Sequence, residues 1–325
     1  MKTGVLVGID IGGTNTKLAL VDLRGRVLAR DMIDTSASRG PEALFRDLGQ
    51  RIPDLLGGRR SILAAGVGCA GLIDEHGKLH ASPNLPGWEK TSLGRIARRH
   101  LGVNTTVDND ANAAAYGEYK RGCGKNARML VCVTLGTGVG GGIVSHGRIL
   151  KGASGYASEI GHMTIHLNGR RCKCGNRGCL EAYVGTDALV RSARGLLAKR
   201  KSALLATRTT LTPEVIARAA RNGDSVAKEV FERAAHHLGA ALASLVNLLN
   251  PDTIALAGGV AGGFDLMKKP LNDEIAARAF AEAAQAVTVY KAQLGNDAAV
   301  VGAALIARDA AGSPPRATRA ADRSR

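Results

Sequence analysis

VLVGIDIGGTNTKLALV, residues 5–21, contains two apolar runs separated by a short glycine turn. Val5–Asp10 and Thr16–Val21 each fit a buried strand, and the residues between them fit a tight turn. Glycine lets a backbone approach an anion closely, and Thr14 together with backbone N–H groups can donate to phosphate oxygens. Asp10, at the strand end, could organise Mg²⁺ through water. We interpret this stretch as a phosphate-binding β-hairpin, with an ordinary solvated hairpin as the alternative.

A second glycine turn follows an apolar strand near the middle of the chain, at residues 135–142 (LGTGVGGG). Gly136, Gly138 and Gly141 match the G-x-G-x-x-G spacing of a dinucleotide-binding loop, but such a loop must open a helix. The residues after Gly142 are typical of a strand and a turn, so a second phosphate-binding hairpin explains them better. Two hairpins facing each other would hold the phosphates of ATP from both sides, which suits phosphoryl transfer.

The rest of the chain alternates strands and helices around these two hairpins. The predicted helices cover residues 41–56, 93–100, an Ala-rich segment from Asp110 to Tyr119, 182–197, 213–221, 225–249 and 298–310. Further strands are expected at 63–69, 103–108 and 253–257. This pattern indicates two related α/β lobes, each beginning with strand, glycine turn and strand.

Length and composition agree with two lobes. The chain has 325 residues, of which 45% are hydrophobic, and it contains 42 glycines, as in an α/β enzyme with many tight turns. No apolar run approaches the roughly 18 residues that span a bilayer, and the first residues lack a signal-peptide layout. We expect a cytoplasmic protein without a membrane partner.

The formal net charge of +16 has three readings: attraction of nucleic acid, attraction of a polyanionic substrate, or plain solubility. The basic residues are dispersed along the chain, and only 3% of the residues are aromatic, which leaves little for stacking on bases. We therefore favour the solubility reading and expect no nucleic-acid partner.

Three of the six cysteines, Cys172, Cys174 and Cys179, lie within eight residues of one another. In a cytoplasmic chain such a cluster indicates a metal rather than disulfides. Three thiolates and one imidazole would make a closed tetrahedral zinc site, which leaves no open position for catalysis. The spacing alone does not choose between His162 and His166 as the fourth ligand.

Five motifs taken together resemble the ROK family, which comprises repressors, open-reading-frame proteins and sugar kinases. They are Asp10-Ile-Gly-Gly-Thr14, Asn109-Asp110-Ala-Asn112, the 135–142 turn, Glu159-Ile-Gly-His162, and Cys172-Lys-Cys174-Gly-Asn-Arg-Gly-Cys179-Leu-Glu181. The resemblance extends to about residue 310. It implies the two-lobed actin-like ATPase (ribonuclease H-like) fold with an interlobe active-site cleft, and a homodimer.

The resemblance also implies the lobe boundaries. Residues 1–110 with about 297–311 would form the first lobe, which the last helix closes, and residues 111–296 the larger lobe with the zinc loop. Residues 312–325 would be a disordered basic tail.

Roles for individual residues follow from the same resemblance. Asp110, which by position alone is equally an N-cap or a catalytic base, matches the family's base. The sugar-hydroxyl ligands would be Asn84, Asn109, Asp110, Glu159, His162 and Glu181, and His162 would also be the fourth zinc ligand, with Cys172, Cys174 and Cys179. The ATP-binding residues would be Asp10, Gly12, Gly13, Thr14, Lys17, Gly136, Thr137, Gly138, Gly258 and Gly259.

These roles predict an ATP- and Mg²⁺-dependent hexose kinase with one structural Zn²⁺, and glucose converted to glucose 6-phosphate as the leading reaction. A kinase for N-acetylglucosamine or N-acetylmannosamine would use the same catalytic parts. The basic surface keeps polyphosphate open as a donor. A sugar-responsive repressor is a further alternative, although only about four residues precede the first strand and leave no room for a helix-turn-helix domain.

Overall fold

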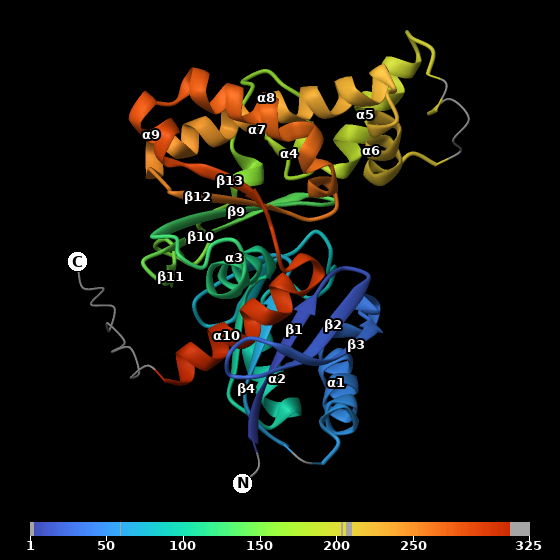
Figure 1. Cartoon of the computed structure of the whole chain (residues 1–325). Helices are drawn as coiled ribbons and strands as arrows, with labels where there is room; N and C mark the ends of the chain where they lie inside the picture. Colours follow the sequence, from blue (N-terminus) through green and yellow to red (C-terminus); the bar gives the residue numbers. More distant parts are fainter. Residues whose placement is uncertain (1–2, 59, 203, 206–209, 313–325) are drawn as a thin grey trace, which may run out of the picture.

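The computed structural model describes residues 3–58, 60–202, 204–205 and 210–312, which form two lobes built on two five-stranded sheets (Figure 1). All but the first residue of the predicted tail at 312–325 lies outside this range. Within the described residues, no helix is both long and apolar enough to cross a membrane.

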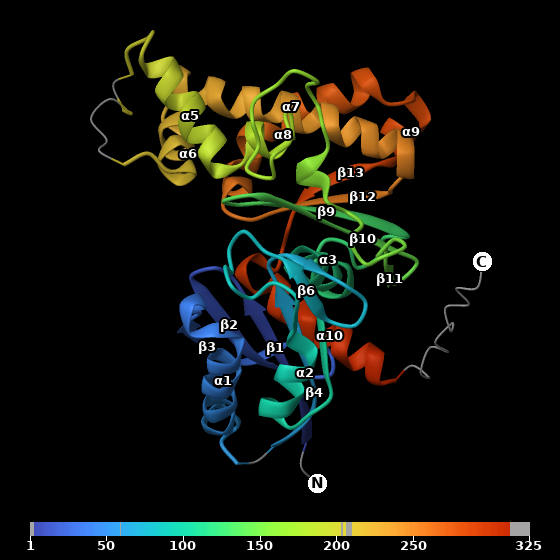
Figure 2. The same cartoon turned by 180° about the vertical axis from the view of Figure 1, so that it is seen from behind.

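The first lobe contains a sheet in the order β3-β2-β1-β4-β8. Its strands are β1 (Thr3–Ile11), β2 (Asn15–Val21), β3 (Val27–Asp34), β4 (Arg60–Cys69) and β8 (Thr105–Asn109). β1, β2 and β3 pair antiparallel, whereas β4 and β8 run parallel to β1. One face is covered by α1 (Gly40–Leu56) and α2 (Leu93–Leu101), which bury apolar side chains such as Phe45 and Leu93 against the strands (Figure 2). A small sheet of β5 (Leu72–Ile73), β6 (Lys78–Ala81) and β7 (Thr91–Ser92) adjoins this lobe.

The second lobe repeats this plan with the sheet order β11-β10-β9-β12-β13. Its strands are β9 (Met129–Leu135), β10 (Val139–Ser145), β11 (Arg148–Ile149), β12 (Thr253–Ala257) and β13 (Thr288–Lys291). The outer face carries the helices α4 (Glu181–Val184), α5 (Thr186–Leu197), α6 (Pro213–Arg221), α7 (Ser225–Leu249), α8 (Phe264–Arg278) and α9 (Ala281–Ala286).

The two sheets share the same strand order and the same pattern of directions. In each, the first three strands in sequence form an antiparallel meander and the last two run parallel to the first. This duplication confirms the predicted α/β class and the actin-like ATPase fold. Because parallel strands end at the same edge of a sheet, loops after β1, β4 and β8, and after β9 and β12, gather at two facing edges.

Two helices lie between the sheets: α3 (Asp110–Arg121) and α10 (Ala298–Ala311). One apolar cluster joins them to both sheets, with Leu6 from the first, Leu130 from the second, Tyr116 from α3 and Val300 from α10. α10 packs against β1 and β4 of the first sheet. α3, which we assigned to the larger lobe, contacts both.

Three local expectations were wrong in detail. The helix predicted over 182–197 is interrupted at Gly185, whose backbone is extended. Asn109, not Asp110, is the N-cap of α3. Only residues 136–138 form the second glycine turn, because β10 begins at Val139. The sequence reasoning also missed α8 and β13.

The glycines of β10 let α3 lie directly on the second sheet. A Cβ atom at Gly142 would lie 2.6 Å from the Ala111 carbonyl oxygen and from the Ala115 Cβ. Gly140 faces the same helix, and a Cβ added at Gly140 would lie 3.0 Å from the Cβ of Ala111. Small residues on both sides thus set the distance between α3 and the second lobe.

We expect Gly142→Ala to lower the free energy of unfolding by about 1–3 kcal/mol, because the added methyl overpacks this contact. Urea denaturation measures it. The matched control is Gly195→Ala on the exposed side of α5, where no atom lies within 4 Å of the added Cβ. That control should gain about 0.5–1 kcal/mol. An unchanged urea midpoint for Gly142→Ala would contradict the close contact.

Candidate active site

The N-terminus of α3 carries Asp110 into the space between the lobes. Asn109 ends β8 and accepts hydrogen bonds through Oδ1 from the backbone N–H groups of Ala111 (2.8 Å) and Asn112 (3.1 Å). Its Nδ2 donates to the Gly71 carbonyl oxygen at 3.0 Å. These bonds fix the first turn of α3, and they leave Asn109 one amide hydrogen for a substrate.

Asp110 is the first residue of α3, and its Oδ1 accepts from the Ala111 backbone N–H at 2.9 Å. Burial, together with the negative charges of Asp10 and Glu159, raises the pKa of this carboxyl group to about 6, against the lowering effect of the backbone N–H groups. A carboxylate with a pKa near the working pH can accept a proton and release it again, as a general base must.

An ion pair between the buried Asp108 and the partly exposed Lys151 lies next to Asp110. Asp108 lies in β8 with 4% of its surface exposed, and its Oδ2 is 2.7 Å from Lys151 Nζ of the second lobe. Oδ1 accepts from Asn112 Nδ2 at 3.0 Å and from the Asn109 backbone N–H at 2.9 Å. The two residues before Asp110 are therefore held from both lobes.

The first glycine turn lies beside Asp10, where β1 ends. Asp10 faces Lys17 across the β1–β2 ladder, and Lys17 Nζ is 3.4 Å from Asp10 Oδ2. Burial raises the pKa of the Asp10 carboxyl group, while Lys17 lowers it. Gly13 and Thr14 are exposed, and a Cβ at Gly13 would lie 3.0 Å from Asn84, so the loop of Asn84 adjoins this turn.

The second glycine turn joins the ends of β9 and β10. The Gly136 N–H donates to the Gly138 carbonyl oxygen at 2.9 Å, and Thr137 between them is exposed. Gly258, which follows β12, has a φ of +88°, and a Cβ there would lie 2.4 Å from the Leu135 carbonyl oxygen. The turn at Gly258 and Gly259 is therefore a direct neighbour of the second glycine turn.

Glu181 links the second glycine turn to the cysteine cluster. Its Oε2 accepts from the Val139 backbone N–H at 3.0 Å, and its Oε1 is 3.5 Å from Cys172 Sγ. A Cβ at Gly138 would lie 2.6 Å from Glu181 Oε2, so a larger residue there would displace the carboxylate from its present position. A pocket adjoins this contact, and its lining residues are Thr137, Arg171, Cys172, Lys173, Glu181, Ala182, Gly185, Asp187, Ala188 and Arg191.

Glu159 is a further carboxylate near Asp110 and Glu181. Burial raises the pKa of Glu159; nearby His162 lowers it, and Glu181 raises it. His162 Nε2 is 4.0 Å from Glu159 Oε2. Glu159 follows Ser158, whose φ of +72° is unusual outside glycine and whose buried hydroxyl has no hydrogen-bond partner among the described residues.

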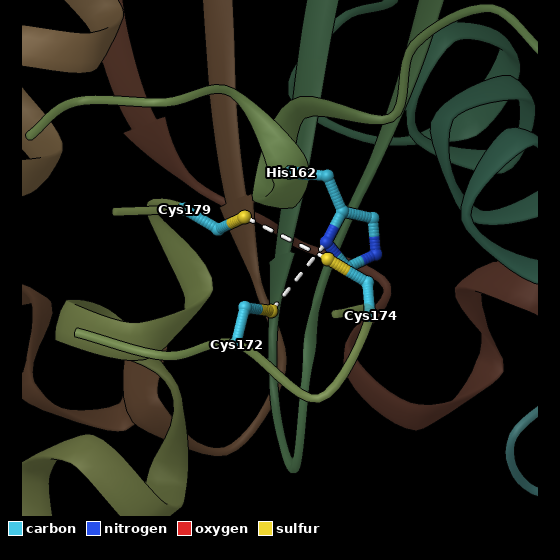
Figure 3. A group of neighbouring side chains, drawn as sticks. All are labelled: His162, Cys172, Cys174 and Cys179. Atoms are coloured by element: carbon cyan, nitrogen blue, oxygen red, sulfur yellow. Dashed lines mark hydrogen bonds between the residues drawn. The ribbon is translucent and has the colours of Figure 1, made fainter. Parts of the chain in front are cut away.

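The cysteine cluster is assembled as the spacing predicts (Figure 3). One ligand atom each from His162, Cys172, Cys174 and Cys179 lies within 4.8 Å of the others. Cys174 Sγ is 3.7 Å from Cys179 Sγ, and Cys172 Sγ is 3.8 Å from His162 Nδ1. Zinc–sulfur bonds of about 2.3 Å in a tetrahedron place sulfur atoms about 3.8 Å apart, so this donor set fits a zinc ion.

The structure separates the two candidate histidines. His162 Nδ1 points into the cysteine cluster, whereas its Nε2 lies on the side of Glu159. His166 lies elsewhere: its Nε2 is 3.4 Å from His237 Nδ1, and its ring packs against Tyr183. The geometry therefore favours His162, the choice that the resemblance implied.

Most of the predicted site residues are thus brought together around α3 and the two glycine turns. Sequence reasoning missed Asp108, Lys151 and Ser158. For Asp108 a signal was available, because a carboxylate inside an apolar strand immediately before Asn109 calls for a partner. Nothing in the local pattern marks Lys151, since its partner lies 43 positions away in the other lobe.

Comparisons with known proteins identify the family. The ROK family model matches residues 6–310. A glucokinase of Streptomyces coelicolor is 35% identical over 315 residues, which cover 94% of this chain and 98% of that protein. A xylose repressor of Bacillus subtilis is 28% identical, and the matched region covers 95% of this chain and 78% of the repressor.

Among solved structures, a ROK family glucokinase from Streptomyces griseus in complex with glucose and AMPPNP superimposes with a TM-score of 0.79. It is 34% identical, and the match covers 94% of this chain and all of that one. With a family model that spans nearly the whole chain and a shared two-lobed fold, this protein belongs to the ROK family.

Proposed function

We propose that this protein is an ATP-dependent glucokinase that transfers the γ-phosphoryl group of Mg·ATP to a glucose hydroxyl and yields glucose 6-phosphate. The observation that carries this proposal is Asp110, a buried carboxylate with a pKa of about 6 at the start of α3, close enough to Asp10 of the first lobe and Glu159 of the second for their charges to raise its pKa. The similarity to glucokinases over most of the chain supports it.

In this proposal Asp110 accepts the proton of the sugar hydroxyl while the new O–P bond forms and the bond to ADP breaks. Alignment and charge stabilisation supply most of the rate in such a transfer. Asp110 suits the role because α3 fixes its position and its neighbouring carboxylates keep it basic. Remaining hydroxyls would bind the exposed side chain of Asn84, the free amide hydrogen of Asn109, and Glu159, His162 and Glu181.

The donor would bind across the two glycine turns. Backbone N–H groups at Gly12, Gly13 and Thr14, and at Gly136, Thr137 and Gly138, would receive the phosphates, and the turn at Gly258 and Gly259 would receive the adenosine. Lys17 and Asp10 lie at the edge of the first turn, where Asp10 would hold waters of the Mg²⁺ ion. Lys173 and Arg191 add positive charge to the pocket beside Thr137.

A structural zinc ion would bind His162, Cys172, Cys174 and Cys179. Its chemistry is to hold four ligands in a tetrahedron, without an open position. It would thereby fix the loop between β11 and α4, from which Glu159, His162 and Glu181 face the sugar. A cytoplasmic location, expected from the sequence, and a homodimer, implied by the resemblance, remain predictions.

The test is an ADP-release assay of the purified protein with Mg·ATP and, separately, glucose, N-acetylglucosamine, N-acetylmannosamine, mannose and fructose. We expect glucose to give the highest kcat/KM. A higher kcat/KM for an N-acyl sugar would leave Asp110 as the proposed base but show that the phosphoryl acceptor is the N-acyl sugar rather than glucose. Turnover with polyphosphate but not with ATP would show that the phosphoryl donor is polyphosphate. No turnover with any of these sugars would contradict the proposed kinase activity.

A further inference from the structure

The chain passes between the two sheets at two places. The first crossing, residues 122–128, leads from α3 to β9, and the second crossing, residues 292–297, leads from β13 back to α10 (Figure 1). Together with α3 and α10, these two segments make up the covalent links between the sheets, so a rotation of one sheet against the other involves these links.

One side chain binds both crossings. Glu118, in the last turns of α3, is wholly buried. Its Oε2 accepts from the backbone N–H groups of Cys123 and Gln293, both at 3.1 Å, and its Oε1 accepts from that of Leu294 at 2.7 Å. The carbonyl oxygen of Glu118 also accepts from the N–H groups of Gly122 (2.9 Å) and Gly124 (3.1 Å) of the first crossing.

Close packing around Glu118 restricts the conformation of its side chain. A Cβ at Gly122 would lie 1.8 Å from Glu118 Oε2, so only glycine fits beside the carboxylate. One residue earlier, α3 touches α10 without intervening side chains: a Cβ at Gly117 would lie 2.3 Å from the Ala298 carbonyl oxygen, and one at Gly302 would lie 1.7 Å from that of Ala113. The carboxylate therefore belongs to a rigid body that also contains Asp110.

We propose that Glu118 is a positioning residue that fastens both crossings to α3, so that the second lobe turns about this point while Asp110 stays aligned with the substrates. The proposal rests on the proposed kinase function, since it assigns Glu118 a part in lobe closure around sugar and nucleotide. Glu118 touches no predicted substrate ligand and lies two helical turns from Asp110.

The three backbone N–H groups of the two crossings need a carboxylate at position 118. It offers two acceptor oxygens and no donor, and three N–H groups point at it. In Glu118→Gln one oxygen becomes an NH₂ group. In either orientation of the amide, a backbone N–H group of at least one crossing then faces this NH₂ group instead of an acceptor. A buried N–H group without an acceptor is unfavourable, so that crossing will move away.

The test combines hydrogen exchange with kinetics on Glu118→Gln. We expect at least one amide of the second crossing, Gln293 or Leu294, to exchange at least about 10-fold faster than in the wild type, because the second crossing meets the NH₂ group in either orientation. We also expect kcat with glucose to fall at least about 10-fold at a temperature well below unfolding, because the lobes no longer close in one geometry. Gly122→Ala, which displaces the carboxylate but keeps Glu118, should produce both effects if Glu118→Gln does not fold.

The matched control is Asp224→Ala, which removes the N-cap of α7 outside the crossings. It should lose stability while kcat stays within about twofold. Unchanged exchange at both Gln293 and Leu294 overturns the proposal, and so does faster exchange with a kcat like that of the control. If the wild type itself turns over no sugar, the proposed function fails, whereas hydrogen exchange still decides whether Glu118 holds both crossings.

Discussion

Asp110→Asn is expected to lower kcat for sugar phosphorylation by about 10²–10⁴-fold, the usual contribution of a general base. An amide cannot take the hydroxyl proton, although it keeps the size of the carboxyl group and can still accept from the Ala111 N–H. Steady-state assays with Mg·ATP and glucose measure this loss. The sugar should still bind, so its Kd by calorimetry should change far less than kcat.

The same substitution should make the protein more stable near neutral pH. Burial raises the Asp110 pKa from its ordinary 3.8 to about 6, so the contribution of this group to folding is fully present below pH 3.8 and is lost as the pH rises through about 6. Asn removes the buried charge. We expect the free energy of unfolding at pH 7–8 to rise by about 1–3 kcal/mol.

The pH dependence of the wild type provides a second readout. Because only the ionised carboxylate accepts a proton, kcat/KM should fall as the pH falls through about 6, and the residual activity of Asp110→Asn should lack this step. Asp47→Asn, at an exposed ion pair with Arg39, serves as the control and should retain full activity. A variant at Asp110 with more than a tenth of the wild-type kcat would contradict the assignment of the base.

His162→Asn is expected to abolish both bound zinc and activity. Structural zinc sites of this kind bind with apparent free energies of about 10–16 kcal/mol, and the ordering of the surrounding loop depends on that binding. Without the fourth ligand, the loop that holds Glu159 and Glu181 should lose its fixed shape. Metal analysis of the purified protein should give one zinc per wild-type chain and much less in the variant.

His166→Asn is the matched control, because His166 lies four positions later and contacts His237 and Tyr183 instead of the cysteines. It should keep its zinc and most of its activity. Zinc retained by His162→Asn but lost by His166→Asn would reverse the ligand choice. Full activity after complete removal of zinc would show that the loop needs no metal for the proposed reaction.

Much of the fold follows from local sequence patterns. The predicted helices 213–221 and 225–249 and the strand 253–257 match the structure at both ends. Each has a local cause, since Thr212 and Asp224 cap their helices and glycines follow the strand. α8 was missed because Gly-rich residues precede it and Pro270 lies inside it, and its packing against α7 and β13 stabilises it.

The sequence by itself determined the chemistry of this protein: two glycine turns, an acidic residue at the start of a helix, and three cysteines near a histidine. Each of those features occupies a short stretch of the chain, so the local pattern alone reveals it. The tertiary structure decided the rest. It placed His162 rather than His166 at the cysteines, raised the pKa of Asp110 through burial and the charge of Asp10, and brought both crossings to Glu118. These outcomes depend on contacts between residues far apart in the chain, which packing of two sheets around α3 and α10 sets and no local pattern encodes.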